Sequence, residues 1–382
     1  METIKGFKDY TGEEAVKRKQ MKDVLTRYFT LYGFEPAESP IIEYETFVKG
    51  DNADDDAISE IFKLKDRGKR KLALRYEFTF QLSRLARNKK LPYKRYQLGY
   101  VFRDEPTSTN RFRQFTQCDA DIVGSSIKDE AEILSLASNI LNEFGLKTVI
   151  NINNRKLLNE ILDSEGIKKK EEVIREIDKL DKLSELEIKK NLKKYNAEKM
   201  LDLFKKPESY FKKYDSYSEI IKLKGYCKMY GVKVNFQPFL ARGLSYYNGS
   251  IFEIKSKKMK ETLIAGGSYI VNNFQSTGIS FGLERLSNLS DYKKDNSSIL
   301  VVSLSQDSES IDLISDFRNN GIISSLYYGK PSKALQYADS KSIDYVLFVG
   351  EKEIKNKKYT LKDMKTGKEV SASISSILKK LI

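Results

Sequence analysis

Residues 94–124 read KRYQLGYVFRDEPTSTNRFRQFTQCDADIVG, and this stretch decides the fold of the chain. In its first third, apolar and aromatic residues alternate with polar ones, which is the period of a β-strand whose side chains point to opposite faces in turn. Residues 106–110 supply Pro, Thr, Ser and Asn, a composition typical of turns. Alternation resumes after this loop and continues to Gly124. The stretch therefore predicts two strands joined by a polar connection.

The second strand is expected to have two very different faces. One predicted row is mostly apolar and contains Phe112, Thr116, Cys118, Ala120 and Ile122. The opposite row contains Arg111, Arg113, Phe115, Gln117, Asp119 and Asp121, and the matching parity on the first strand contains Arg103 and Glu105. Such a row is either a solvated face with ion pairs across the hairpin or the floor of a site. In the second interpretation the arginines hold a phosphate, the ring of Phe115 stacks on a flat base and the acids hold polar groups of a substrate.

Composition narrows the possible chemistry. The chain has 382 residues, enough for two or three domains, and a net charge of +14, which favours a polyanionic partner such as nucleic acid. A general preference for lysine is the alternative explanation of this charge. The two cysteines are far apart in sequence and provide neither a disulfide framework nor a zinc cluster. The chain contains no histidine, which excludes Ser-His-Asp triads, His-ligated metals and imidazole bases. The polar start of the chain and the absence of a run long enough to span a membrane predict a cytoplasmic protein.

The first part of the chain contains further periodic segments. Residues 12–31 have helical spacing and are followed by Gly33, which is typical of a helix end. A strand is expected at 39–43. Another is expected at 72–79, where Arg75, Glu77 and Thr79 would share one face. Residues 129–144 predict an amphipathic helix that ends at Gly145.

The second part changes in character. Residues 153–224 are rich in Lys and Glu at helical spacing, which predicts a separate helical insertion. The segment 239–249, FLARGLSYYNG, places Arg242 and Tyr246 at the same strand parity. Residues 264–269 and 276–286 each contain two glycines, and a linker is expected at 287–298. Strand, helix, strand, helix and strand are then predicted at 299–304, 308–318, 322–328, 332–340 and 345–349, a pattern typical of a small α/β domain.

Several of these segments resemble a known family. FRDE at 102–105 with RFRQFTQ at 111–117 is similar to motif 2 of class II aminoacyl-tRNA synthetases, and QCDADIVG at 117–124 resembles histidyl-tRNA synthetases in their archaeal and eukaryotic form. ARGLSYY at 241–247 resembles the signature of histidyl-tRNA synthetases, with Ser245 in place of the usual Asp. Residues 276–286 look like motif 3, in which glycines precede a helix, here one that would carry Arg285. The predicted helix at 12–31 and the strand up to residue 43 look like motif 1. Residues 264–269 match the family's glycine-rich turn only in part.

The resemblance implies an α+β catalytic domain with an antiparallel sheet, a helical insertion and a C-terminal α/β anticodon-binding domain. The implied boundaries are 1–152 for the first part of the catalytic domain, 153–228 for the insertion, 229–290 for its second part and 291–382 for the anticodon-binding domain. The implied function is ligation of L-histidine to tRNA(His) through histidyl-adenylate, by a homodimer. The alternative is the synthetase-like regulatory subunit of ATP phosphoribosyltransferase, which usually lacks the last domain.

The resemblance also implies roles for individual residues. Catalysis is expected from Arg103 and Arg242, which would hold the α-phosphate. The expected ATP-binding residues are Arg103, Glu105, Arg111, Arg113, Phe115 and Arg285. The expected histidine-binding residues are Glu77, Thr79, Gln117, Asp121, Arg242, Tyr246 and Tyr247. Mg²⁺ is expected to accompany the substrate ATP, and no protein residue is singled out as a metal ligand.

Overall fold

The computed structural model describes residues 2–49, 60–181, 183–241, 246–259, 261–292 and 297–381. The chain divides into two compact units. The first comprises residues 1–9 and 18–292, and the second comprises residues 10–17 and 293–382. Each unit has its own sheet and its own apolar core.

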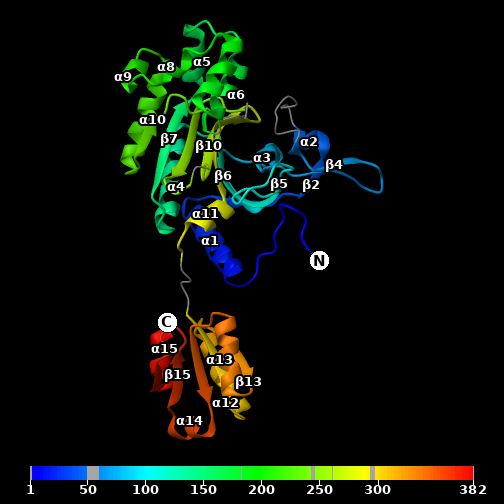
Figure 1. The fold of residues 1–382 in the computed structure, drawn as a ribbon, viewed down its shortest axis with the longest axis vertical. Helices are drawn as coiled ribbons and strands as arrows, with labels where there is room; N and C mark the ends of the chain where they lie inside the picture. The colour runs from blue at the N-terminus through cyan, green and yellow to red at the C-terminus, as the bar shows by residue number, and fades with distance from the viewer. Residues whose placement is uncertain are drawn as a thin grey trace. The chain divides into compact units, whose positions relative to one another are not determined.

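The first unit is built on a large sheet with the strand order β1-β5-β6-β11-β10-β9-β7-β8 (Figure 1). Its neighbouring strands are antiparallel except at the two edges, where β1 is parallel to β5 and β8 is parallel to β7. The strands are β1 Glu35–Pro36, β5 Tyr93–Phe102, β6 Gln114–Val123, β7 Thr148–Asn154, β8 Val234–Phe236, β9 Ser250–Ser256, β10 Ile264–Val271 and β11 Phe274–Gly282. Strands β5 and β6 confirm the two strands predicted within 94–124, and the sheet confirms the predicted antiparallel catalytic fold.

Two helices cover the apolar face of this sheet. Helix α1 (Gly12–Leu31) and helix α4 (Ile127–Glu143) confirm the helix predicted at 12–31 and the amphipathic helix predicted at 129–144. The ring of Phe29 in α1 lies 5.3 Å from the ring of Tyr96 in β5 and 5.9 Å from that of Phe281 in β11. The row of β6 that was predicted to be apolar joins the same cluster, since Cys118 and Ile122 are fully buried. Burying such side chains stabilises the fold by roughly 1.5–3 kcal/mol each.

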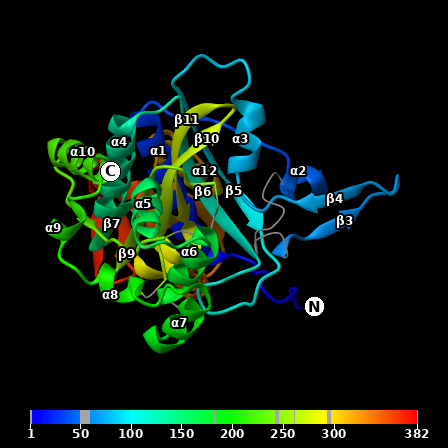
Figure 2. The ribbon, with the colours of Figure 1, turned by 90° about the horizontal axis from the view of Figure 1, so that it is seen from above.

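A three-stranded sheet with the order β2-β4-β3 extends from the large sheet as an arm (Figures 1 and 2). Its strands are β2 Ile42–Tyr44, β3 Lys63–Lys65 and β4 Lys71–Leu74, and α2 (Glu45–Lys49) follows β2. The strand predicted at 72–79 is therefore wrong beyond Leu74. Thr79 instead begins helix α3 (Thr79–Leu85), so Arg75, Glu77 and Thr79 do not form one row of a strand. Arg75 donates to the carbonyls of Ser39 and Tyr100, which is a structural role.

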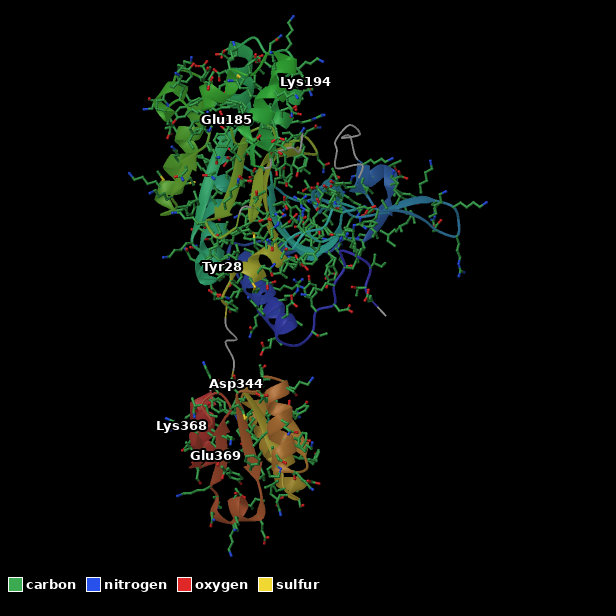
Figure 3. All side chains as sticks on the ribbon, in the orientation of Figure 1. Tyr28, Glu185, Lys194, Asp344, Lys368 and Glu369 are labelled. Carbon is green, nitrogen blue, oxygen red and sulfur yellow. The ribbon has the colours of Figure 1, made fainter. Side chains whose placement is uncertain are left out.

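The chain between β7 and β8 is helical, as predicted. The elements are α5 Arg155–Ser164, α6 Lys170–Asp178, η2 Lys179–Asp181, α7 Glu185–Leu192, η3 Lys193–Tyr195, α8 Met200–Phe204, α9 Glu208–Phe211 and α10 Tyr217–Met229. Charged side chains such as Glu185 and Lys194 are exposed on these helices (Figure 3). Buried side chains of the same segment, for example Leu157 and Phe211, belong to the apolar cluster of the large sheet. The predicted boundaries of a separate insertion domain remain a prediction.

The glycine-rich turn predicted at 264–269 is wrong, because these residues belong to strand β10. A Cβ atom on Gly266 would lie 2.2 Å from the carbonyl oxygen of Gly278 and 2.4 Å from the ring of Phe252. One on Gly267 would lie 2.5 Å from the carbonyl oxygen of Ser250. The glycines are thus required by close packing between strands. The predicted helix after β11 is confirmed as α11 (Leu283–Leu289), so the predicted linker begins inside a helix.

The second unit has a five-stranded sheet with the order β13-β12-β14-β15-β16, in which the first three strands are parallel and the last two antiparallel. Its elements are β12 Ser298–Ser303, α12 Asp307–Asn319, β13 Ile323–Tyr328, α13 Pro331–Ser340, β14 Tyr345–Val349, α14 Glu351–Asn356, β15 Tyr359–Asp363, β16 Glu369–Ala372 and α15 Ile374–Leu381. The first five confirm the predicted α/β pattern. Lys362 and Glu369, directly opposite on β15 and β16, form an ion pair at 2.8 Å (Glu369 is labelled in Figure 3).

Candidate active site

The second face of β5 and β6 carries buried charges in place of apolar side chains. Arg95 of β5 is fully buried, and its Nη2 lies 3.0 Å from Oδ2 of Asp121, its partner position on β6. The same nitrogen donates to the carbonyl oxygen of Phe78 at 3.0 Å. Tyr269 of β10 donates its hydroxyl to Asp121. The site interpretation of this row is therefore favoured over a solvated face, because these side chains are removed from water.

Gly278 of β11 makes room for this group of side chains. It pairs with Asp121 across the sheet, and a Cβ atom in its place would lie 2.0 Å from Oδ1 of Asp121 and 2.9 Å from the hydroxyl oxygen of Tyr269. A contact under 3.0 Å with a buried carboxylate requires the carboxylate to move. The glycine is therefore required for Asp121 and Tyr269 to meet.

Two more carboxyl groups share this part of the sheet. Asp119, two residues from Asp121, accepts a hydrogen bond at Oδ2 from Nε2 of Gln117 at 2.8 Å. Burial raises the pKa of Asp119, and the neighbouring Asp121 raises it further, while Arg95 opposes the shift. Burial raises the pKa of Glu77 to about 7, with Arg103 and a hydrogen bond from Thr79 acting in the opposite direction. Thr79, at the start of α3, thus lies beside Glu77 as expected, although both are outside a strand.

The opposite end of the face is cationic. The guanidinium of Arg103, just after β5, lies 4.2 Å from the ring centroid of Tyr76 and 5.1 Å from that of Phe115. Such cation–π contacts fix the plane of the guanidinium without neutralising its charge. Its backbone N–H donates to the carbonyl oxygen of Arg113 at 2.9 Å, which ties the two strands together beyond the β5–β6 ladder.

The connection between β5 and β6 contributes the remaining motif residues. Nη1 of Arg111 lies 3.4 Å from Oε2 of Glu105, and Nη2 of Arg113 lies 3.2 Å from Oδ1 of Asp104. The backbone N–H of Arg113 donates to the carbonyl oxygen of Gly6 at 2.9 Å. Gly6 has a φ of +87°, so the start of the chain turns back onto this connection at a residue with conformational freedom.

Helix α11 brings a further guanidinium to the cationic end. Arg285 donates to the carbonyl oxygen of Thr262 at 2.7 Å. Burial lowers the pKa of Arg285, and the positive charges of Arg111 and Arg103 lower it further. Three guanidinium groups therefore lie close enough to repel one another, which is favourable only when an anion is bound among them.

Glu284 fixes α11 against the sheet. It is buried, accepts from the backbone N–H of Thr116 at 3.0 Å and pairs with Nη2 of Arg18 in α1 at 2.8 Å. Both partners of this ion pair are buried, with side chains about 5% exposed. The pair holds the neighbouring Arg285 next to β6.

The tyrosines of the sequence signature lie at the acidic end. The rings of Tyr246 and Tyr247 are 4.7 Å apart, and both are near Tyr269, at 5.5 and 6.5 Å. Glu77 is among the charges that raise the pKa of Tyr246. The predicted strand at this segment is wrong for the residues described, because Tyr246 precedes β9 and lies in a turn. Arg242 and Ser245 lie outside the described residues.

The end of β7 anchors this tyrosine segment. The buried amide of Asn153 donates to the carbonyl oxygens of Pro238 and Leu240 at 3.0 and 2.9 Å. The backbone N–H of Arg155 donates to the carbonyl oxygen of Gly249 at 2.8 Å. Both ends of the segment are therefore held by Asn153 and Arg155, two residues that the sequence analysis did not single out.

The structure thus brings the described candidate residues to one face of β5, β6 and β11. Missing from the sequence prediction were Tyr76, Arg95, Asn153 and Tyr269, and Asp119 was part of the predicted row without a role of its own. Arg95 had the parity of that row, so a signal existed for it. Asn153, Tyr76 and Tyr269 reach the site through contacts between distant segments, which parity within one strand does not reveal.

The described residues provide neither a metal-binding cluster nor a membrane-spanning helix. No group of three or more His, Cys, Asp or Glu side chains is placed to hold a metal ion in the described part of the chain. No helix among the described ranges is both long and apolar enough to cross a membrane.

The charges of the site differ in sign between its two ends. Arg103, Arg111 and Arg285 form a cationic end suited to a polyphosphate, with Phe115 as a flat surface beside it. Glu77, Asp119 and Asp121 form an anionic end suited to a substrate with N–H donors and positive charge. One face of one sheet is therefore able to orient an amino acid and a nucleotide side by side.

Comparisons with known proteins agree with this geometry. A family model described as histidyl-tRNA synthetase matches residues 6–286, and one described as anticodon binding domain matches residues 298–382. A histidine–tRNA ligase 1 of Bacillus cereus is 34% identical over 419 aligned residues, covering 99% of this chain and 96% of the relative.

Solved structures share the fold. The histidyl-tRNA synthetase of Nostoc sp. PCC 7120 superposes with a TM-score of 0.85 at 24% identity, covering 100% of this chain and 98% of that one. A protein of Bacillus halodurans C described as ATP phosphoribosyltransferase regulatory subunit/histidyl-tRNA synthetase superposes with a TM-score of 0.76 at 21% identity, covering 91% and 97%. These organisms are bacteria, and the expected likeness to the archaeal and eukaryotic form remains a prediction.

Proposed function

This chain belongs to the histidyl-tRNA synthetase family and is an ATP-dependent histidine–tRNA ligase, and we propose that its residues divide the reaction between the two ends of the polar face. The observation that supports this most is that the guanidinium groups of Arg103, Arg111 and Arg285 lie close enough to affect one another, while Asp119 and Asp121 are buried farther along β6, where Arg95 pairs with Asp121.

In the first step a carboxylate oxygen of histidine attacks the α-phosphorus of ATP. The bond from that phosphorus to the bridging oxygen of the β-phosphate breaks, and pyrophosphate leaves. Arg103 and Arg242 hold the α-phosphate, where negative charge accumulates, and Arg111 and Arg285 hold the β- and γ-phosphates. This work is positioning and electrostatic stabilisation, which needs no protein nucleophile.

The adenine and the rest of the motif 2 connection complete the nucleotide site. Phe115 stacks on the base, and its contact with Arg103 places the ring and the guanidinium in adjacent layers. Arg113 and Glu105 shape the connection that closes over the nucleotide, since each is engaged with a neighbour in that connection.

The amino acid lies at the acidic end. Glu77, Thr79 and Gln117 hold the α-amino and carboxylate groups, and Asp121 with Tyr246 or Tyr247 binds the imidazole. A site built from buried polar groups rejects analogues that lack the ring N–H, because its own groups are then left without partners.

In the second step the terminal ribose hydroxyl of tRNA(His) attacks the carbonyl carbon of histidyl-adenylate, and AMP leaves. The chain contains no histidine, so the proton of that hydroxyl goes to a phosphate oxygen of the adenylate. A normal transfer rate from a phosphorothioate adenylate would contradict this route.

Mg²⁺ fits the nucleotide end. Mg²⁺ in nucleotide sites is usually held by one or two carboxylates together with substrate phosphates. Burial raises the pKa of Glu60, and the charge of Glu105 raises it further, so two carboxyl groups lie close together here. Glu105 and Glu60 would hold the ion, which supplies positive charge against the polyphosphate.

We place the partners of the enzyme as follows. The second unit contacts the anticodon of tRNA(His), the helices between β7 and β8 lean on its acceptor arm through exposed lysines, and the enzyme is a homodimer. Two unpaired, buried cysteines fit the reducing cytoplasm.

Pyrophosphate exchange into ATP tests the proposal. Purified full-length protein with Mg²⁺ is assayed with each amino acid in turn, and exchange is expected with histidine alone. Binding of histidine without exchange would instead support a regulatory role, which the described anticodon-binding fold of residues 298–381 disfavours.

A further inference from the structure

The acidic end of the site contains more negative charge than its own cations balance. Asp119 and Asp121 lie two residues apart on the same face of β6 and share one buried cation, Arg95, which lowers the pKa of both. Of the two aspartates, only Asp121 lies at hydrogen-bonding distance from Arg95. When both aspartates are ionised, the two carboxylates with Arg95 have a net charge of −1, and burial opposes that state because it raises the pKa of both, that of Asp119 to about 7.

The neutral groups around Asp119 do not balance its charge. Gln117 donates to Oδ2 of Asp119, and Ser280, its partner position on β11, lowers the pKa of Asp119 through a hydrogen bond. Oδ1 of Asp119 is buried and has no direct side-chain or backbone hydrogen bond of good geometry among the described residues. An unpartnered, charged oxygen in the interior is costly, so binding of a ligand that donates a hydrogen bond to this oxygen is strongly favoured.

Other charged groups near the pocket have different tasks. Glu77 also has a buried oxygen, Oε1, without a described partner, and in the proposed function it takes the substrate ammonium. Arg103 is stacked between two aromatic rings at the phosphate end. The tyrosines at 246, 247 and 269 are neutral donors and acceptors whose pKa burial raises in the cases of Tyr246 and Tyr269.

We propose that this pocket binds the substrate ring as a doubly protonated imidazolium, with Asp119 as the residue that selects its charge. This rests on the proposed function, since it assumes that histidine occupies the acidic end. Asp121 accepts one ring N–H as already proposed, and Asp119 accepts the second. From the sequence, Asp119 was expected only as one of the acids of the polar row, without a role of its own.

The expected pH dependence follows from linkage. A ring whose pKa is raised on binding contributes affinity that is complete below its free pKa, about 6.5, and is lost as pH rises above that value. The Michaelis constant for histidine should therefore be lowest near pH 7 and rise by about tenfold per pH unit above it, until the pKa of the bound ring is reached. It should also rise at lower pH, because Glu77 and Asp119, whose pKa values burial raises to about 7, take up protons there. Neutral-ring recognition predicts no such rise above pH 7.

Nitrogen NMR of ¹⁵N-labelled histidine bound to the full-length protein is the direct test. Ring shifts typical of imidazolium at pH 8, where free histidine is neutral in its ring, are expected. Neutral-tautomer shifts at pH 8 would overturn the proposal. This readout needs no catalysis and no variant.

Kinetics of exchange give the second test. 1,2,4-Triazolylalanine keeps the shape, amino group and carboxylate of histidine, but its ring is not protonated near neutrality. Its Michaelis constant should exceed that of histidine by about 10- to 100-fold and should show only the titration of the amino group. The preference should shrink in Asp119→Asn, whereas Asp23→Asn, which removes an exposed carboxylate of α1, should keep it.

The outcomes separate the two levels of inference. Exchange with a flat pH profile above pH 7 and equal use of the triazole analogue would overturn the imidazolium proposal and leave the ligase function intact. Exchange with neither amino acid at any pH would overturn the proposed function itself.

Discussion

Strands β6 and β12 are both almost wholly buried, but their chemistry differs. In β12, Ile299, Leu300, Val301 and Val302 fill both faces with aliphatic side chains. In β6, one face is equally apolar and the other carries Gln117, Asp119 and Asp121. Burying charges opposes folding unless they are paired or bind a ligand. The polar row of β6 therefore lowers the stability of the first unit relative to an apolar row. Bound substrates supply the hydrogen-bond and charge partners that these buried side chains lack.

The largest expected effect comes from removing a cation of this face. Arg103→Ala should lower the rate of pyrophosphate exchange by about 10²–10³-fold, as for the loss of one donor to a developing anion. The melting temperature should change little, because the guanidinium is stacked and not part of a buried ion pair. Arg84→Ala is the control for the exchange rate alone, since Arg84 also lies over an aromatic ring, Phe47 at 5.0 Å, but outside the site, and pairs with the buried carboxylate of Glu43. Equal rates of pyrophosphate exchange for Arg103→Ala and Arg84→Ala would show that the polar face has no special role in the reaction.

The apolar strand should respond in the opposite way. Leu300→Ala removes a fully buried side chain from β12 and should lower the free energy of unfolding of the second unit by about 3 kcal/mol. Pyrophosphate exchange should be retained, while charging of tRNA falls. Calorimetry and the two activity assays measure this, with Val370→Ala on the exposed surface as the control. Loss of exchange in Leu300→Ala would show that the two units are not independent in function.

The same contrast explains what the sequence revealed. Alternation predicted β5 and β6 and the polar row on β6, because period and burial are both local properties of a strand. The helix at Thr79 was missed because the alternation of residues 72–79 continues past the end of β4. Gly266 and Gly267 were assigned to a turn, although their role depends on Phe252 and Ser250 from another strand. Interactions set by the order of strands in a sheet leave no periodic trace in the sequence.

A pH titration sharpens the comparison further. The folded-state pKa of Glu77 is about 7, against about 4.3 in an unfolded chain. The folded state then binds more protons than the unfolded state between these values, so stability falls as pH rises from 4 to 7. In Glu77→Gln the free energy of unfolding should fall by about 2–3 kcal/mol less than in the unchanged protein as pH rises over this range.

Urea unfolding without ligand, at pH 4 and at pH 8, measures this difference. Asp119 remains in both proteins, and because its charge raises the pKa of Glu77, the difference contains the titration of Glu77 and its coupling to Asp119. The variant is expected to be the more stable protein at pH 8 and to show no advantage at pH 4. Parallel pH profiles for the two proteins would mean that Glu77 is charged in the free enzyme.

The smallest expected effect compares two glycines. Gly278→Ala places a methyl group against Asp121 and Tyr269 and should cost about 1–3 kcal/mol of stability, as overpacking does. Gly225→Ala, inside α10, meets no atom within 4 Å and should stabilise by about 0.5–1 kcal/mol. Only Gly278→Ala should also raise the Michaelis constant for histidine, because Asp121 must move to admit the methyl group. If Gly278→Ala binds histidine normally, the carboxylate of Asp121 does not contact the ring, and the acidic end of the face has a structural role alone.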